Sequence, residues 1–92
     1  MQVELDGKFK RNFQTILEHI TKDKITASKN FKKGLFKQIK NLSNFPYKYR
    51  KSFYFEDENI RDMTFKGYTI VYEINIDEDL IVVLNIFNQN KR

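Results

Sequence analysis

The stretch IRDMTFKGYTIVYEI, residues 60–74, decides the fold because it contains a tight turn and the two strands that flank it. Lys66-Gly67 suits a two-residue hairpin turn, since glycine adopts the positive φ that such turns need. From residue 68 to 76 every second side chain is apolar or aromatic, which is typical of a strand with one face in the core. The turn fixes the strand register, and the predicted pairs are Phe65 with Tyr68, Met63 with Ile70, and Arg61 with Tyr72.

Arg61 and Asp62 are adjacent and oppositely charged, as in a catalytic pair, but the strand register places their side chains on different faces of the sheet. Residues directly opposite each other on paired strands share a face, so Arg61 lies on the face of Tyr72, at the rim of the core. Asp62 belongs to the other face. Only a one-residue bulge would bring the two side chains together, so we do not expect a hydrogen-bonded catalytic pair here.

The N-terminal half reads as one short strand followed by two helices. Residues 2–6 alternate as a strand, and residues 8–22 carry apolar side chains at helical spacing. A second helix is predicted over 27–42 with Thr26 as its N-cap. The connection is short enough to force an antiparallel helical hairpin. The predicted buried stripes are Phe9, Phe13, Ile16, Leu17 and Ile20 on the first helix, and Ala27, Phe31, Leu35, Ile39 and Leu42 on the second.

Two features of the helical hairpin and the loop after it leave alternatives open. Phe36 lies at the edge of the second helix's basic side, where it either packs on the first helix or is exposed for a partner. Pro46 ends the helical part. Residues 47–58 form a loop or an irregular strand, and their basic and aromatic side chains suit either single-stranded nucleic acid or a plug for the core.

The order of elements is therefore β-α-α-β-β-β. Residues 80–87, LIVVLNIF, are apolar nearly throughout, as in a strand covered on both faces. We predict a single α+β domain over residues 1–92, in which an antiparallel helical hairpin packs on one face of a small, mainly antiparallel sheet.

The face of the sheet opposite the helices is called the open face below. A three-residue turn at 77–79 predicts that Ile74 pairs with Val82, Tyr72 with Leu84 and Ile70 with Ile86. Those pairs place eight side chains on the open face: Thr69, Val71, Glu73, Asn75, Ile81, Val83, Asn85 and Phe87. A monomer is not expected to leave four of these apolar groups in water together. Either a partner segment covers the open face or the loop at 47–58 folds over it.

Charge is distributed unevenly along the chain. The net charge is +5, and no acidic residue occurs from Lys24 to Phe55. The acids cluster at 56–58 and 77–79 instead. This separation favours an acidic partner, either nucleic acid or an acidic protein segment, although a lysine-rich face can also serve solubility alone.

Composition excludes several functional classes. The chain has no cysteine, so disulfides and thiolate metal sites are excluded. A single histidine, His19, makes neither a triad nor a metal site. No phosphate-binding loop or calcium loop is present, and no run reaches transmembrane length. We expect a cytoplasmic protein with no metal and no cofactor.

The element order resembles that of the RelE/ParE toxin superfamily of bacterial type II toxin–antitoxin systems. The resemblance rests on FP at 45–46, on residues 60–74 and on IVVLNIF at 81–87, and it spans nearly the whole chain. It implies a toxin that a cognate acidic antitoxin wraps and neutralises. RelE-like members cut mRNA on the ribosome, whereas ParE-like members block DNA gyrase.

The departures from the RelE-like pattern favour the ParE-like branch. Thr69 stands where a RelE-like nuclease has an arginine, and no tyrosine or histidine follows Phe87. The open face offers Asp62 and Glu73, which repel phosphate. If the chain were nevertheless a ribosome-dependent mRNA endonuclease, its catalytic residues would be Arg61, Lys66, Lys91 and Arg92.

The resemblance also implies a hetero-oligomer with the antitoxin. It implies two sets of binding residues, one for the antitoxin and one for the target. The expected antitoxin-binding residues are Val71, Glu73, Ile81, Val83, Asn85 and Phe87 on the open face, with Lys32, Lys33 and Lys40 on the second helix. The expected target-binding residues are Lys37, Arg50, Lys51 and Arg61. The target is gyrase in the first hypothesis, and the ribosome with its mRNA in the second.

Overall fold

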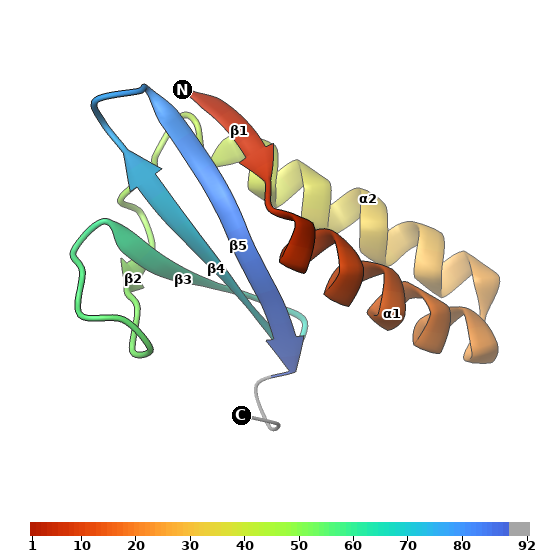
Figure 1. Cartoon of the computed structure of the whole chain (residues 1–92). Coiled ribbons are helices and arrows are strands. Elements are labelled where there is room, and N and C mark those ends of the chain that lie inside the picture. Colours follow the sequence, from red (N-terminus) through yellow and green to blue (C-terminus); the bar gives the residue numbers. More distant parts are fainter. Residues whose placement is uncertain (89–92) are drawn as a thin grey trace.

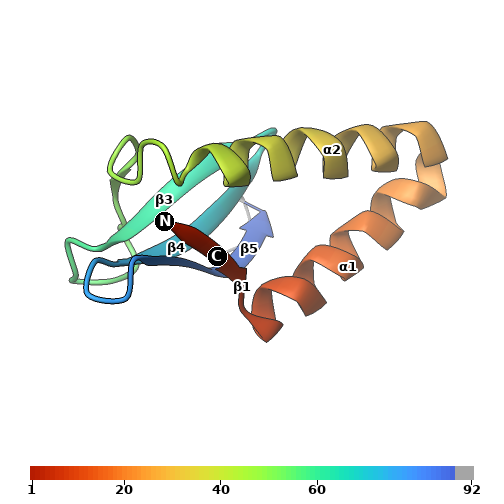
Figure 2. The same ribbon diagram turned by 90° about the horizontal axis from the view of Figure 1, so that it is seen from above.

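A computed structural model of the chain describes residues 1–88, and in it a helical hairpin packs against a five-stranded sheet (Figure 1). The hairpin tip projects beyond the sheet in both views (Figures 1 and 2). The α+β class and the predicted element order are confirmed. The elements are β1 (Gln2–Leu5), α1 (Gly7–Asp23), α2 (Ile25–Asn41), β2 (Arg50–Lys51), β3 (Ile60–Phe65), β4 (Tyr68–Asn75) and β5 (Leu80–Asn88).

The sheet has the order β1-β5-β4-β3-β2, with β1 parallel to β5 and the other pairs antiparallel. The hairpin of β3 and β4 has the predicted register, including the pairing of Arg61 with Tyr72. Lys66 and Gly67 both have positive φ, 47° and 86°, as a two-residue hairpin turn of the primed type requires. Lysine there carries strain that glycine would not.

The predicted register between β4 and β5 is wrong over half of its length, from Tyr72 to Asn75. The connecting loop has four residues, 76–79, so Ile74 pairs with Ile81 and Tyr72 with Val83. A bulge beside Val71 and Tyr72 then adds one residue to β5, and Ile70 pairs with Ile86 as predicted. The longer loop and the bulge cancel each other.

This shift corrects the placement of Ile81 and Val83. Both were expected on the open face, but both belong to the core beneath the helices and are fully buried. The physical reason is the period of two along a strand, because a shift of one residue moves each side chain to the other face. The extra residue at the bulge is Leu84, between Val83 and Asn85.

The helices bury the expected faces with small changes at their ends. α1 begins after Asp6, whose carboxylate accepts a hydrogen bond from the Lys8 amide at 2.9 Å. α2 begins earlier than predicted, at Ile25, and its N-cap is Lys24, which makes no side-chain cap bond. Ser28 replaces Ala27 in the buried stripe. Phe36 packs on α1, with its ring 5.3 Å from that of Phe13.

The segment between α2 and β3 is held to the sheet by Tyr72. The Tyr72 hydroxyl donates a hydrogen bond to the Pro46 carbonyl at 2.6 Å, and the ring is fully buried. Burial raises the pKa of this phenol well above its ordinary value, and the nearby positive charge of Arg61 offsets only part of that rise.

The raised pKa of Tyr72 predicts a loss of stability in alkali. Above about pH 10 the phenol ionises in the unfolded chain but stays protonated in the folded one, so the free energy of unfolding falls as pH rises, by up to about 1.4 kcal/mol per pH unit. Tyr72→Phe should remove this contribution and cost about 1 kcal/mol at neutral pH. Urea unfolding at pH 8 and pH 11 measures both effects, and equal pH slopes for the two proteins would contradict the prediction.

Within residues 1–88 no helix is long and apolar enough to cross a membrane.

Candidate functional site

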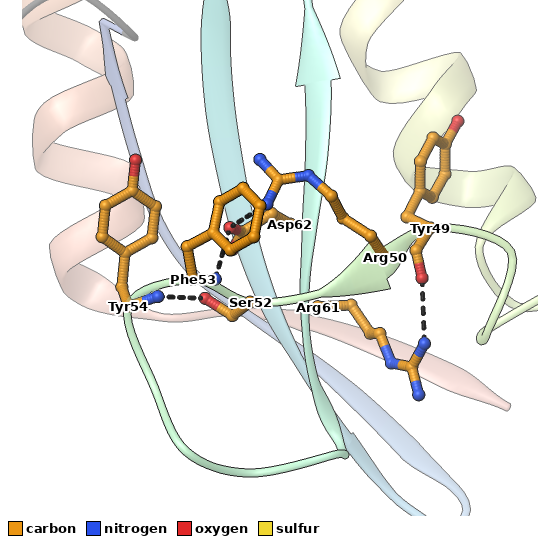
Figure 3. Close-up of polar contacts among 7 residues, drawn as sticks. All are labelled: Tyr49, Arg50, Ser52, Phe53, Tyr54, Arg61 and Asp62. Carbon is orange, nitrogen blue, oxygen red and sulfur yellow. Dashed lines mark hydrogen bonds and ion pairs between the residues drawn. The ribbon is translucent and has the colours of Figure 1, made fainter.

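The open face is partly covered by a segment called the strap, residues 52–58, which crosses in front of β3 (Figure 3). The strap begins where the Ser52 amide donates to the Ile60 carbonyl at 2.8 Å. The Tyr54 amide then donates to the Ser52 hydroxyl at 3.1 Å. These bonds fix the start of the strap against the sheet.

Asp62 anchors the strap from below. The residue is only 2% exposed, and its carboxylate accepts a hydrogen bond from the Phe53 amide at 3.1 Å (Figure 3). The Arg50 guanidinium lies 3.7 Å from the same oxygen and stacks on the Phe53 ring at 3.6 Å. The other carboxylate oxygen is buried without a hydrogen-bond partner. Asp62 therefore has a structural role, because it lies beneath the strap and holds it to the sheet.

The strap carries an aromatic side chain to β5. The Tyr54 ring meets the Phe87 ring edge-on at 5.1 Å between centroids. Val71 lies on the same face and is only 2% exposed. Of the two expected covers for the apolar side chains, the loop at 47–58 is the one that covers Val71, through the strap, while Ile81 and Val83 face the core instead of the open face.

What is left on the open face is an apolar cavity, called here the open-face hollow. It has a volume of about 640 Å³, within the range of ligand pockets. Side chains from the strap, β4 and β5 form its apolar walls, and the start of α1 closes one side. Its lining residues are Asp6, Lys8, Tyr54, Phe55, Val71, Leu84, Asn85 and Phe87. A hollow of this composition can hold an apolar side chain from a partner.

Sequence reasoning placed Val71, Asn85 and Phe87 on this surface but missed Leu84. Leu84 reaches the hollow only because the bulge gives β5 an extra residue, which no pattern in the sequence marks. Asn85 accepts a hydrogen bond from the Asn12 amide at 2.6 Å, so it also ties β5 to α1. Glu73 does not line the hollow and lies opposite Ile60 and Val82.

Arg61 points away from Asp62, as the strand parity predicts (Figure 3). Its guanidinium donates to the Glu58 carbonyl at 2.9 Å and to the Tyr49 carbonyl at 3.1 Å. It also lies 4.9 Å from the centre of the Tyr47 ring. Arg61 therefore organises the loop before β3.

Comparison with known proteins identifies the family and agrees with the fold. The family model described as ParE toxin of type II toxin-antitoxin system, parDE, matches residues 3–92. The chain belongs to the ParE toxin family. A solved structure titled "Chromosomal ParDE TA system from P. aeruginosa" is similar to this chain, with a TM-score of 0.75 and 14% identity, covering 96% of this chain and 95% of that one. No curated protein sequence matches the chain.

Of the four residues that a nuclease would need, the two that the structure describes, Arg61 and Lys66, lie far apart in this ParE-family fold. Arg61 lies near the start of β3 and Lys66 lies in the turn at its far end, five residues away, which is about 16 Å along an extended strand. The Lys66 amine lies 5.6 Å from the Phe65 ring. Lys91 and Arg92 lie outside the described residues.

The basic residues that were expected to bind the antitoxin or the target lie on α2, β2 and β3 of this family member. On α2 the lysines expected to meet the antitoxin or the target are exposed: Lys32, Lys33, Lys37 and Lys40. On β2 both Arg50 and Lys51 are exposed. In the strand register Arg50 lies opposite Asp62 on β3, and Lys51 lies opposite Arg61. Paired residues share a face, so Arg50 lies on the open face while Lys51 and Arg61 lie on the other. The predicted target-binding residues are thus divided between two faces.

Acidic clusters give no metal site in the part of the chain that the structure describes. Among residues 1–88 no three His, Cys, Asp or Glu side chains come together as ligands for a cation.

Proposed function

We propose that this ParE-family toxin inhibits DNA gyrase and that a cognate antitoxin holds it inactive in the cytoplasm. The observation that carries the proposal is the family match over residues 3–92, which assigns the whole described fold to the ParE toxin family. The departures from the RelE-like pattern, with Thr69 in place of an arginine and no tyrosine or histidine after Phe87, favour the ParE-like branch, whose members block gyrase. Binding to gyrase needs no catalytic constellation in the toxin.

The open-face hollow is the proposed anchor point for the antitoxin. An apolar antitoxin side chain that enters between Tyr54 and Leu84 would be surrounded by apolar atoms and would touch Phe87. Burying a side chain of leucine or phenylalanine size contributes about 1.5–3 kcal/mol. The aromatic wall already exists in the free toxin, so little conformational entropy is lost on binding.

Charge supports an acidic antitoxin that also reaches α2. Lys32, Lys33 and Lys40 are exposed, and the chain from Lys24 to Phe55 has no acid to neutralise them. Exposed pairs add little affinity each, about 0–1 kcal/mol, but the summed positive field accelerates encounter with an acidic segment. Salt should therefore slow antitoxin association more than it speeds dissociation.

Gyrase is proposed to bind the basic side of the loop and α2, using Lys37, Lys51 and Arg61. Lys51 and Arg61 lie opposite each other on β2 and β3 and share a face. Arg50, which was predicted to join them, lies on the open face against Phe53 and Asp62. It is proposed here to fix the strap.

Supercoiling of relaxed plasmid by purified gyrase tests the function. The toxin is expected to inhibit supercoiling in proportion to its concentration, and toxin mixed beforehand with the product of the adjacent reading frame should have no effect. A matched variant, Lys51→Glu, should inhibit less while still binding the antitoxin. Unimpaired supercoiling together with codon-specific cuts in toeprinting of translating ribosomes would replace gyrase by the ribosome as the target.

A further inference from the structure

Two adjoining hollows at the C-terminal end of α2 are distinct from the open-face hollow. The first, called the aromatic hollow, has a volume of about 610 Å³ and is lined by Asn41, Asn44, Phe45, Pro46, Tyr47 and Lys48. The second, called the lysine hollow, has a volume of about 330 Å³ and is lined by Lys37, Gln38, Lys40, Asn41 and Asn44. The two share Asn41 and Asn44 and so form one continuous surface.

The aromatic hollow presents two exposed rings, of which the Tyr47 ring is held in place by its own contacts. Phe45 is 62% exposed and Tyr47 is 44% exposed. The Tyr47 hydroxyl donates to the Asn59 side chain at 2.7 Å, and Arg61 stacks on the same ring. Between the two rings, the Pro46 carbonyl is bound by Tyr72. The Tyr47 ring is exposed and already held, so it loses little entropy when a ligand stacks on it.

The lysine hollow supplies positive charge next to these rings. Lys37 and Lys40 lie one helical turn apart on α2, and both are exposed. Among the described residues, no Asp or Glu lines either hollow. The helix C-terminus carries about half a negative charge, but the carbonyls of Ile39 and Lys40 are already hydrogen-bonded by Leu42 and Ser43. The lysines therefore dominate the local field.

The shared asparagines lie between the rings and the lysines. The Asn44 amide nitrogen donates to the Asn41 side-chain oxygen at 3.1 Å. This bond leaves the Asn41 amide as a donor and the Asn44 carbonyl as an acceptor. An amide donor beside an acceptor is the pattern that reads the edge of a base.

We propose that these two hollows bind a nucleotide unit, with its base on Phe45 and Tyr47 and its phosphate at Lys37 and Lys40. A flat base with hydrogen-bonding edges, joined to a phosphate, matches the rings, the amides and the lysines together. The unit comes either from a free nucleotide or from an unpaired nucleotide in a strand. An acidic peptide would use the lysines but not the rings. This binding does not rest on the proposed gyrase target.

Fluorescence anisotropy with a fluorescein-labelled single-stranded dA 12-mer tests binding of a nucleotide in a strand. NMR titration with ATP tests binding of a free nucleotide. The Phe45 side chain is exposed, so Phe45→Ala should weaken binding about tenfold without changing the melting temperature. Lys37→Ala with Lys40→Ala should reduce the slope of log affinity against log salt by about 0.7, because the two lysines hold one phosphate. Phe53→Ala is the matched control, because Phe53 is more exposed and lines neither hollow, and it should bind like the unmodified chain.

The results distinguish a nucleotide in a strand from a free nucleotide, and both of these from the absence of a nucleotide site. Binding of the 12-mer with loss in Phe45→Ala supports a strand nucleotide, and binding of ATP alone with the same loss supports a free nucleotide. Equal affinity for Phe45→Ala and the unmodified chain would overturn the proposal. So would equal affinity for the 12-mer and its duplex, equal competition by a hexaglutamate peptide, or no binding of either probe up to about 1 mM.

Discussion

Phe87→Asp is expected to weaken antitoxin binding at least about 30-fold, because an interface anchor contributes about 2 kcal/mol or more. Phe87 forms a wall of the open-face hollow and packs edge-on against Tyr54. An aspartate there places a charge in the apolar site that the antitoxin side chain would fill. Isothermal titration with the product of the adjacent reading frame measures the effect.

Phe53→Asp is the matched control for this substitution. Phe53 also belongs to the strap, but its ring is 75% exposed and lies outside the hollow. The control should change antitoxin affinity by less than threefold, which is about 0.6 kcal/mol. Equal losses for the two variants would show that general damage to the strap, and not the hollow, explains the result.

Val83→Asp is expected to unfold the protein at room temperature. Val83 is fully buried in the core under the helices, where an unpaired carboxylate has no partner. The cost exceeds about 4 kcal/mol, a large share of the stability of a small domain. Circular dichroism with urea titration should show no cooperative transition.

The neighbouring substitution Val82→Asp tests the corrected register. Val82 lies opposite Glu73 and is partly exposed, so its carboxylate can be hydrated. The expected loss of stability is about 1 kcal/mol, from strand propensity and repulsion between like charges directly opposite each other. If Val82→Asp unfolds the protein and Val83→Asp does not, the register first predicted from sequence would be the correct one.

The sequence predicts the fold well where a single local pattern determines it. The two-residue turn at Lys66-Gly67 and the alternation of β4 predicted three residue pairs between β3 and β4 correctly. The same reasoning failed at the next turn, because Ile76 joins the loop and the bulge at Leu84 restores the register farther along. Neither event leaves a periodic signal, since Asp77, Glu78 and Asp79 fit a three- or a four-residue loop equally well.

The candidate site was predicted less completely for the same reason. Phe87 and Val71 were placed correctly on the open face, but Ile81 and Val83 were not. The strap was one of two expected covers, and it covers Val71 while leaving a hollow beside it. Burial of Asp62 could not be predicted, because its partners, the Phe53 amide and Arg50, come from a segment without regular periodicity.

Methyl NMR of the toxin with and without its antitoxin tests most directly the claim that the open-face hollow is where the antitoxin binds. We expect large shifts for the Leu84 and Val71 methyl groups, which line the hollow, and small ones for Val83 and Leu35, which lie in the core. Unchanged Leu84 and Val71 signals at saturation, with shifts elsewhere on the chain, would contradict it.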